Sequence, residues 1–133
     1  MRMLHPPDWA RPQGYSHGVA AEGRLVFTAG QLGCLPDGSF VANNFVAQAR
    51  QALLNVVAVL AEAGASPEHI VRLNWYVLDR YEYLETQREL HRIYLEIIGE
   101  HFPAMTVLDI DGLVEEEALL QIEATAVIPD GHA

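Results

Sequence analysis

The clearest alternation of apolar and polar positions lies near the end of the chain, at residues 118–128. Every second residue there is apolar, which is the period of a β-strand that buries one face. Two other stretches, 70–78 and 105–110, are rich in β-branched, aromatic and other apolar residues and also predict strands. The positions predicted to face the core in the last strand are Leu120, Ile122, Ala124, Ala126 and Ile128.

Two longer stretches have helical periodicity instead. Asn43 or Asn44 can cap the first helix. The second runs from about residue 81 to 98, and Asp79 with Glu82 forms a capping box at its start. A glycine follows each stretch and suits a helix end. The predicted inward positions are Ala49, Ala52, Leu53, Val56, Val57 and Leu60, and then Leu84, Leu90, Ile93, Tyr94, Ile97 and Ile98.

The N-terminal part has weaker signals. Residues 1–14 are proline-rich and predict an extended lead-in. Residues 15–31 predict a β-hairpin, with strands at 19–21 and 25–28 on either side of a turn at 22–23. Glycine at the second turn position suits the positive φ that such turns require.

These elements follow one another in the order β-β-α-β-α-β-β, in a single domain of residues 1–133. Two helices can cover one face of a mixed sheet, which predicts a two-layer α+β fold. The other face is expected to carry Trp75, Met105, Val107 and Val127 among polar groups. That mixture is too apolar for water and predicts self-association, unless these are a few tolerated surface hydrophobics.

The charge balance limits the function classes. The formal net charge is -10, and all eight basic residues are scattered arginines. This argues against nucleic acid and anionic membranes as partners, because both require clustered positive charge. The absence of lysine excludes a lysine Schiff base. No apolar stretch approaches the length of a membrane span.

Cysteine and histidine usage gives no cofactor signal. Cys34 is the only cysteine, so an intrachain disulfide is impossible and a cytoplasmic location is expected. No cluster of histidine, cysteine and carboxylate residues has the spacing of a zinc site, so we expect neither a metal nor another cofactor. His17 shares a strand face with Tyr15 and is either a further acid/base group or a surface histidine.

Short motifs occur in one consistent order along nearly the whole chain. They are Gly14-Tyr15 and the stretches 27–31, 48–56, 63–64, 77–79, 102–104 and 122–127. Each is weak alone, but together they resemble the RidA/YjgF family, also described as L-PSP endoribonucleases. The resemblance implies a chorismate-mutase-like α+β fold. It also implies a homotrimer with small-molecule clefts between neighbouring subunits.

The resemblance also implies a set of site residues. In active deaminases of this family an arginine binds the substrate carboxylate, and a late glutamate helps to place the hydrolytic water. The glutamate corresponds to Glu123, and a cleft tyrosine corresponds to Tyr15. Methionine stands at the arginine position, Met105. The other cleft positions implied are Val107 (cysteine in the family), Thr106, Ala29 (serine), Gly30, Gln31 and Gln87 (asparagine), with His17 nearby.

The exchange of arginine for Met105 changes the expected chemistry. We expect Met105 and Glu123 to share a cleft. A substrate carboxylate would then meet like-charge repulsion without a cation to bind it. The sequence therefore predicts a neutral or cationic, partly apolar ligand, and it disfavours both 2-imino acid hydrolysis and ribonuclease activity. Two hypotheses remain: a hydrolase with Glu123 as general base and Tyr15 orienting the substrate, or a non-catalytic trimer that binds a metabolite or protein.

Overall fold

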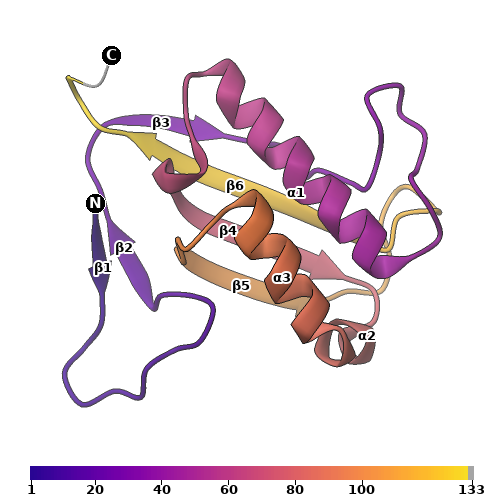
Figure 1. Ribbon diagram of the computed structural model, residues 1–133, viewed down its shortest axis with the longest axis horizontal. Helices are drawn as coiled ribbons and strands as arrows, with labels where there is room; N and C mark the ends of the chain where they lie inside the picture. Colours follow the sequence, from indigo (N-terminus) through magenta and orange to yellow (C-terminus); the bar gives the residue numbers. More distant parts are fainter. Residues whose placement is uncertain (132–133) are drawn as a thin grey trace.

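A computed structural model describes residues 1–131, and it has two layers (Figure 1). Helices α1 (Phe45–Glu62) and α3 (Gln87–Ile97) cover one face of a four-stranded sheet. β6 runs antiparallel to β3 and β4, whereas β5 runs parallel to β4. The predicted α+β class with a mixed sheet is therefore confirmed. Across the sheet the strands are β3 (Arg24–Phe27), β6 (Leu120–Ile128), β4 (Ile70–Val77) and β5 (Ala104–Asp109).

The alternation in β6 places this strand at the centre of the sheet. Its apolar positions face the helices and are buried, as predicted. Leu73 and Val77 of β4 bury the same face. The core therefore lies between the sheet and the apolar stripe of α1, whose fully buried members are Ala49, Ala52, Leu53, Val56 and Leu60.

Both ends of α1 use the signals that the sequence contains. The Asn44 side chain accepts a hydrogen bond from the Ala47 amide at 2.8 Å, which caps the first turn. Gly64, with φ of 81°, follows the helix end. A short 3₁₀ helix, η1 (Pro67–His69), then leads into β4.

The second predicted helix is interrupted. It consists of α2 (Arg80–Glu85) and α3, with Thr86 between them at φ of -105° and ψ of 17°. The Thr86 hydroxyl donates to the carbonyl of Glu82 at 2.7 Å, a side-chain contact that competes with regular helix. The prediction of one continuous helix is therefore wrong. Leu84, which the pattern assigned to the core, is 60% exposed.

The predicted N-terminal hairpin is also wrong. β1 (Arg2–Leu4) lies inside the predicted lead-in and pairs with β2 (Gly18–Ala20), while β3 pairs with β6. The turn between β2 and β3 instead directs the chain onto β6. A Cβ atom at Gly23 would lie 2.0 Å from the carbonyl oxygen of Ile128, so only glycine allows this approach.

The two faces of the sheet differ from the prediction in one respect. Met105 and Val107 lie opposite Leu73 and Trp75 in the β4–β5 register, so all four face the helices. The prediction that Trp75, Met105 and Val107 lie on the uncovered face is wrong. Within residues 1–131, no helix is long and apolar enough to cross a membrane. Prominent apolar side chains of the uncovered face are Leu25, Phe27 and Leu108, which are 58%, 66% and 50% exposed.

Candidate functional site

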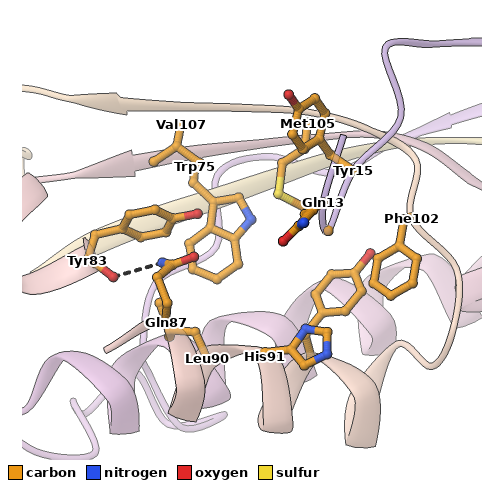
Figure 2. Close-up of a pocket in the computed structure, with 12 residues that line it drawn as sticks. Gln13, Tyr15, Trp75, Tyr83, Gln87, Leu90, His91, Phe102, Met105 and Val107 are labelled. Atoms are coloured by element: carbon orange, nitrogen blue, oxygen red, sulfur yellow. Dashed lines mark hydrogen bonds between the residues drawn. The ribbon is translucent and has the colours of Figure 1, made fainter. Parts of the chain in front are cut away.

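A cavity of about 370 Å³ lies between α3 and the β4–β5 part of the sheet (Figure 2). Strands form its floor and α3 forms its opposite wall. The N-terminal segment before β2 closes one side. The lining residues are Trp75, Met105 and Val107 of the sheet, Gln87, Leu90, His91 and Tyr94 of α3, Gln13, Gly14 and Tyr15 of the N-terminal segment, and Tyr83 and Phe102.

Aromatic rings make up much of the cavity wall. Trp75 packs edge-to-face on Tyr83, with ring centroids 6.0 Å apart. Phe102 stacks on Tyr94 at 5.6 Å and on His91 at 6.3 Å. Such ring pairs add packing energy and fix ring orientation, so they provide flat, rigid surfaces for a ligand.

Backbone contacts hold Tyr15 beside Met105 (Figure 2). The amide of Ser16 donates to the carbonyl of Pro103 at 3.0 Å. The Ser16 hydroxyl donates to the carbonyl of Phe102. These bonds attach the N-terminal segment to the chain that enters β5. A tyrosine near the start of the sequence thereby reaches a cavity built mainly from its second half.

None of the twelve lining residues is an arginine, aspartate or glutamate. Burial raises the pKa of Tyr83 and also that of Tyr94, so both phenols stay uncharged at neutral pH. The Tyr94 hydroxyl donates to the carbonyl of His101 at 2.6 Å. Met105 contributes a polarizable thioether rather than a hydrogen-bond donor. The cavity therefore offers amide, hydroxyl, imidazole and aromatic groups to a ligand, and no arginine to bind an anion bidentately.

Glu123 lies on the other side of the sheet. The Tyr76 hydroxyl donates to its Oε1 at 2.7 Å, and the Asn74 amide donates to the same oxygen at 3.2 Å. The hydrogen bond to Glu123 and burial raise the pKa of Tyr76. Because neighbouring residues of β6 point to opposite faces, Glu123 cannot face the Met105 cavity while Ile122 faces the core. Met105 and Glu123 therefore do not share a cleft within one chain, and a cleft between subunits that joins them stays a prediction.

The other predicted site residues divide between several places. Tyr15, Met105, Val107 and Gln87 line the cavity together. Thr106 is exposed on the uncovered face, where it lies opposite Asn74 in the register. Four of the predicted site residues therefore lie together in this cavity.

Ala29, Gly30 and Gln31 lie outside the cavity, beside β6. The amide of Gln31 donates to the carbonyl of Ile122 at 2.7 Å, which continues the edge pairing of β3. A Cβ at Gly30 would lie 2.1 Å from the Gln121 side chain, so the backbone passes very close there.

His17 also lies outside the cavity, in an exposed aromatic group. Its ring is 5.7 Å from that of Tyr15, 5.0 Å from that of Trp9 and 5.8 Å from that of His5. These contacts indicate a packing role for His17 on the outer side of Tyr15.

Sequence reasoning missed several lining residues. Trp75 was expected on the uncovered face, and Tyr83, His91 and Phe102 had no predicted role at the site. The spacing of Tyr83, Gln87 and His91 at every fourth position could have indicated one helix face of polar and aromatic character. Nothing in the local sequence shows that Gln13 would reach the same cavity.

Comparison with known proteins gives the family. The sequence profile described as "Endoribonuclease L-PSP" matches residues 9–128. The chain belongs to the RidA/YjgF/L-PSP family. A relative from Haemophilus influenzae, a "RutC family protein", is 35% identical over 105 residues, covering 79% of this chain and 80% of that protein. The 2-iminobutanoate/2-iminopropanoate deaminase of Salmonella typhimurium is 32% identical over 108 residues, covering 79% and 80%.

Solved structures of family members have the same fold. The Rid-family protein YyfB from Yersinia pestis superposes with a TM-score of 0.85 at 31% identity, covering 96% of this chain and 98% of that one. The YjgF gene product of E. coli has a TM-score of 0.70 at 27% identity, covering 96% and 98%. These similarities establish the family and the fold.

Proposed function

We propose that this protein binds a small, uncharged imine, enamine or related carbonyl compound and hydrolyses its C=N group. The observation that carries the proposal is the composition of the cavity. It holds Tyr15, Met105, Val107 and Gln87, four positions at which family resemblance predicts the site, and its lining has no arginine, lysine, aspartate or glutamate. Hydrolysis adds water to the imine carbon and releases ammonia, which leaves a carbonyl product.

The cavity selects against substrates that carry a carboxylate. A carboxylate that leaves water needs a cation or several donors to offset the loss of hydration. An arginine at position 105 would provide a bidentate partner, whereas Met105 provides an apolar sulfur. A neutral substrate loses less on entering, and its apolar part packs on the aromatic walls. The name of the Salmonella relative supports the reaction type, and Met105 supports a different substrate charge.

Catalysis requires a group that can activate water, and Glu123 is our candidate. It lies on the uncovered face of its own chain, so it can reach a cavity only in a neighbouring copy. Leu25, Phe27 and Leu108 make that face apolar enough to favour self-association. We therefore include in the proposal a homotrimer in which Glu123 of one subunit completes the cavity of the next.

A second candidate is a family member that binds a small molecule without turning it over. One observation favours it: Oε1 of Glu123 already accepts hydrogen bonds from Tyr76 and Asn74. A carboxylate held in this way is suited to a structural role at a subunit contact. In that case the cavity retains its neutral ligand, and no ammonia is released.

The test compares two imines of different charge. The anionic substrate is 2-iminopropanoate generated by an amino acid oxidase, and the neutral one is benzophenone imine, whose hydrolysis also releases ammonia. We expect the protein to accelerate the neutral imine and not the anionic one, and Glu123→Gln to abolish the acceleration. Strong acceleration of 2-iminopropanoate alone would refute the charge preference. Binding of the neutral imine without ammonia release would support the second candidate.

The assembly is tested separately by sedimentation velocity. We expect the mass of three chains for the wild type, and smaller species for Phe27→Asp, because that substitution places a charge in the proposed contact. Leu84→Asp is the matched control, since Leu84 is similarly exposed at 60% but lies in α2. A wild-type mass of one chain would contradict the proposal that Glu123 of one subunit completes the cavity of the next.

A further inference from the structure

Trp75 has an unusual environment for a buried tryptophan. Its residue surface is 3% exposed, and its indole Nε1 has no hydrogen-bond partner within residues 1–131. An indole N–H is a donor only, and buried tryptophans usually find an acceptor for it. Leaving such a donor unpaired costs about 1–3 kcal/mol.

The indole nitrogen lies beside the cavity, behind side chains that line it. Figure 2 shows it turned towards Met105 and Gln13, and the atom exposes less than 1 Å², so a ligand acceptor reaches it when the flexible Met105 side chain moves aside. β4 fixes the position of the residue, because Trp75 pairs with Val107 on one side and Ile122 on the other. Tyr83 packs edge-to-face on the ring and helps to set its plane.

A donor held in this way discriminates between ligands. A molecule that presents an acceptor atom to Nε1 satisfies the buried N–H. A hydrocarbon of the same shape leaves the N–H unpaired and so gains nothing from this donor. A carboxylate can also accept this bond, but the lining has no arginine or lysine to offset its desolvation. The order of preference should therefore be a neutral acceptor, then either a hydrocarbon or an anion.

We infer that Trp75 Nε1 is a specificity-determining donor that binds the carbonyl oxygen or imine nitrogen of a flat, uncharged ligand in this cavity. The inference rests on the proposed function for the choice of cavity, but it concerns binding and does not require turnover. It names the class of ligand: aryl or vinyl ketones, amides and imines without charge.

The experiment uses a protein with one tryptophan. The chain has two tryptophans, and Trp9 is 56% exposed and outside the cavity lining. In Trp9→Phe the single indole N–H signal in a ¹H–¹⁵N spectrum therefore belongs to Trp75. The probes are acetophenone, ethylbenzene and benzoate, which have similar shape and differ in acceptor and charge.

We expect acetophenone to move the Trp75 indole signal downfield, as a new hydrogen bond does, and ethylbenzene to leave its proton shift nearly unchanged. Acetophenone should bind about 3- to 10-fold more tightly than ethylbenzene, the range of one neutral hydrogen bond. It should also bind more tightly than benzoate. An indole signal that does not move at saturating acetophenone would overturn the inference. Failure of all three probes to bind would overturn it as well.

Trp75→Phe provides the matched variant. It keeps an aromatic ring and removes the donor, so both neutral probes lose similar packing. Calorimetry should then show the acetophenone-to-ethylbenzene preference falling to about one. If Trp75→Phe still preferred acetophenone to ethylbenzene, the hydrogen-bond donor would be a group other than Trp75. If this variant does not fold, the indole signal of Trp9→Phe still decides the question.

Ammonia release from benzophenone imine, measured on the same Trp9→Phe protein, separates the two proposals. Probe binding with the indole shift but no ammonia release would contradict the hydrolase and leave the role of Trp75 intact. Ammonia release with an unmoved indole signal would support the hydrolase and remove Trp75 as the donor.

Discussion

Replacing Met105 with arginine should convert the cavity from one that rejects anions to one that binds them. Met105 is half-buried on β5, and its sulfur points into the cavity (Figure 2). A guanidinium there would meet aromatic faces, including those of Tyr15 and Phe102. No acidic side chain among the described lining residues would neutralise it. The new positive charge would therefore be available to a ligand.

The size of the gain follows from the hydrogen bonds that arginine can form. Hydrogen bonds to a charged group contribute about 1.5–3 kcal/mol, so the Kd for benzoate should fall by about 10- to 150-fold. Titration calorimetry of benzoate against wild type and Met105→Arg measures this ratio. Hydrolysis of 2-iminopropanoate should appear in the same variant if Glu123 of a neighbouring subunit completes the site.

Two control variants distinguish charge from polarity. Met105→Gln has similar length and no charge, and it should leave benzoate affinity within about 2-fold of wild type. Met105→Lys adds the charge without the planar fork and should give a smaller gain than arginine. The reasoning would be refuted if Met105→Arg, shown by circular dichroism to be folded, bound benzoate no better than Met105→Gln.

Three further predictions concern stability. Thr28→Val should cost about 1–3 kcal/mol in urea unfolding, because the Thr28 hydroxyl accepts from the Ala124 amide at 3.0 Å in a buried site. Thr28→Ser should retain most of that stability, and equal losses would contradict the assignment. Gln48→Leu should cost about 2–4 kcal/mol, because Gln48 is fully buried and hydrogen-bonds two carbonyls and one amide of neighbouring loops; a loss below about 0.5 kcal/mol would contradict it. Burial raises the pKa of Tyr94, so the unfolded chain loses this proton first and stability should fall as pH rises above about 10. Unfolding of Tyr94→Phe should depend less on pH there, and an identical pH profile would contradict that.

The sequence predicted the fold well where periodicity and burial agree. The alternation around Ile122 and Ala124 identified the central strand, because a one-residue shift would expose the whole apolar face. The apolar stripe of α1 and the cap at Asn44 were likewise sufficient to place that helix. These signals are local, and the structure retains them.

The sequence could not predict which face of the sheet each cavity residue occupies. Alternation shows that Met105 and Val107 share a face, but their side is set by the parallel register with Leu73 and Trp75. Glu123 was expected beside Met105 because the family resemblance assigns both positions to one cleft. That resemblance does not state which copy of the chain contributes each residue.

The errors at the N-terminus have a similar cause. A glycine between two short apolar runs is compatible with a hairpin, and it is equally compatible with a backbone that passes close to another strand. Gly23 serves the second purpose, because Ile128 lies against it. The break at Thr86 depends on a hydroxyl–carbonyl contact that helical periodicity does not report.

The attachment of Ser16 to the carbonyls of Phe102 and Pro103 has a practical consequence for expression of this protein. Residues 13–15 form a wall of the cavity, although they precede every strand of the four-stranded sheet. A version shortened to begin at Ser16 would retain the sheet and both long helices, and it would still look folded by circular dichroism. Its cavity would nevertheless be open on one side, so normal spectra from such a version would give no assurance that ligand binding had survived.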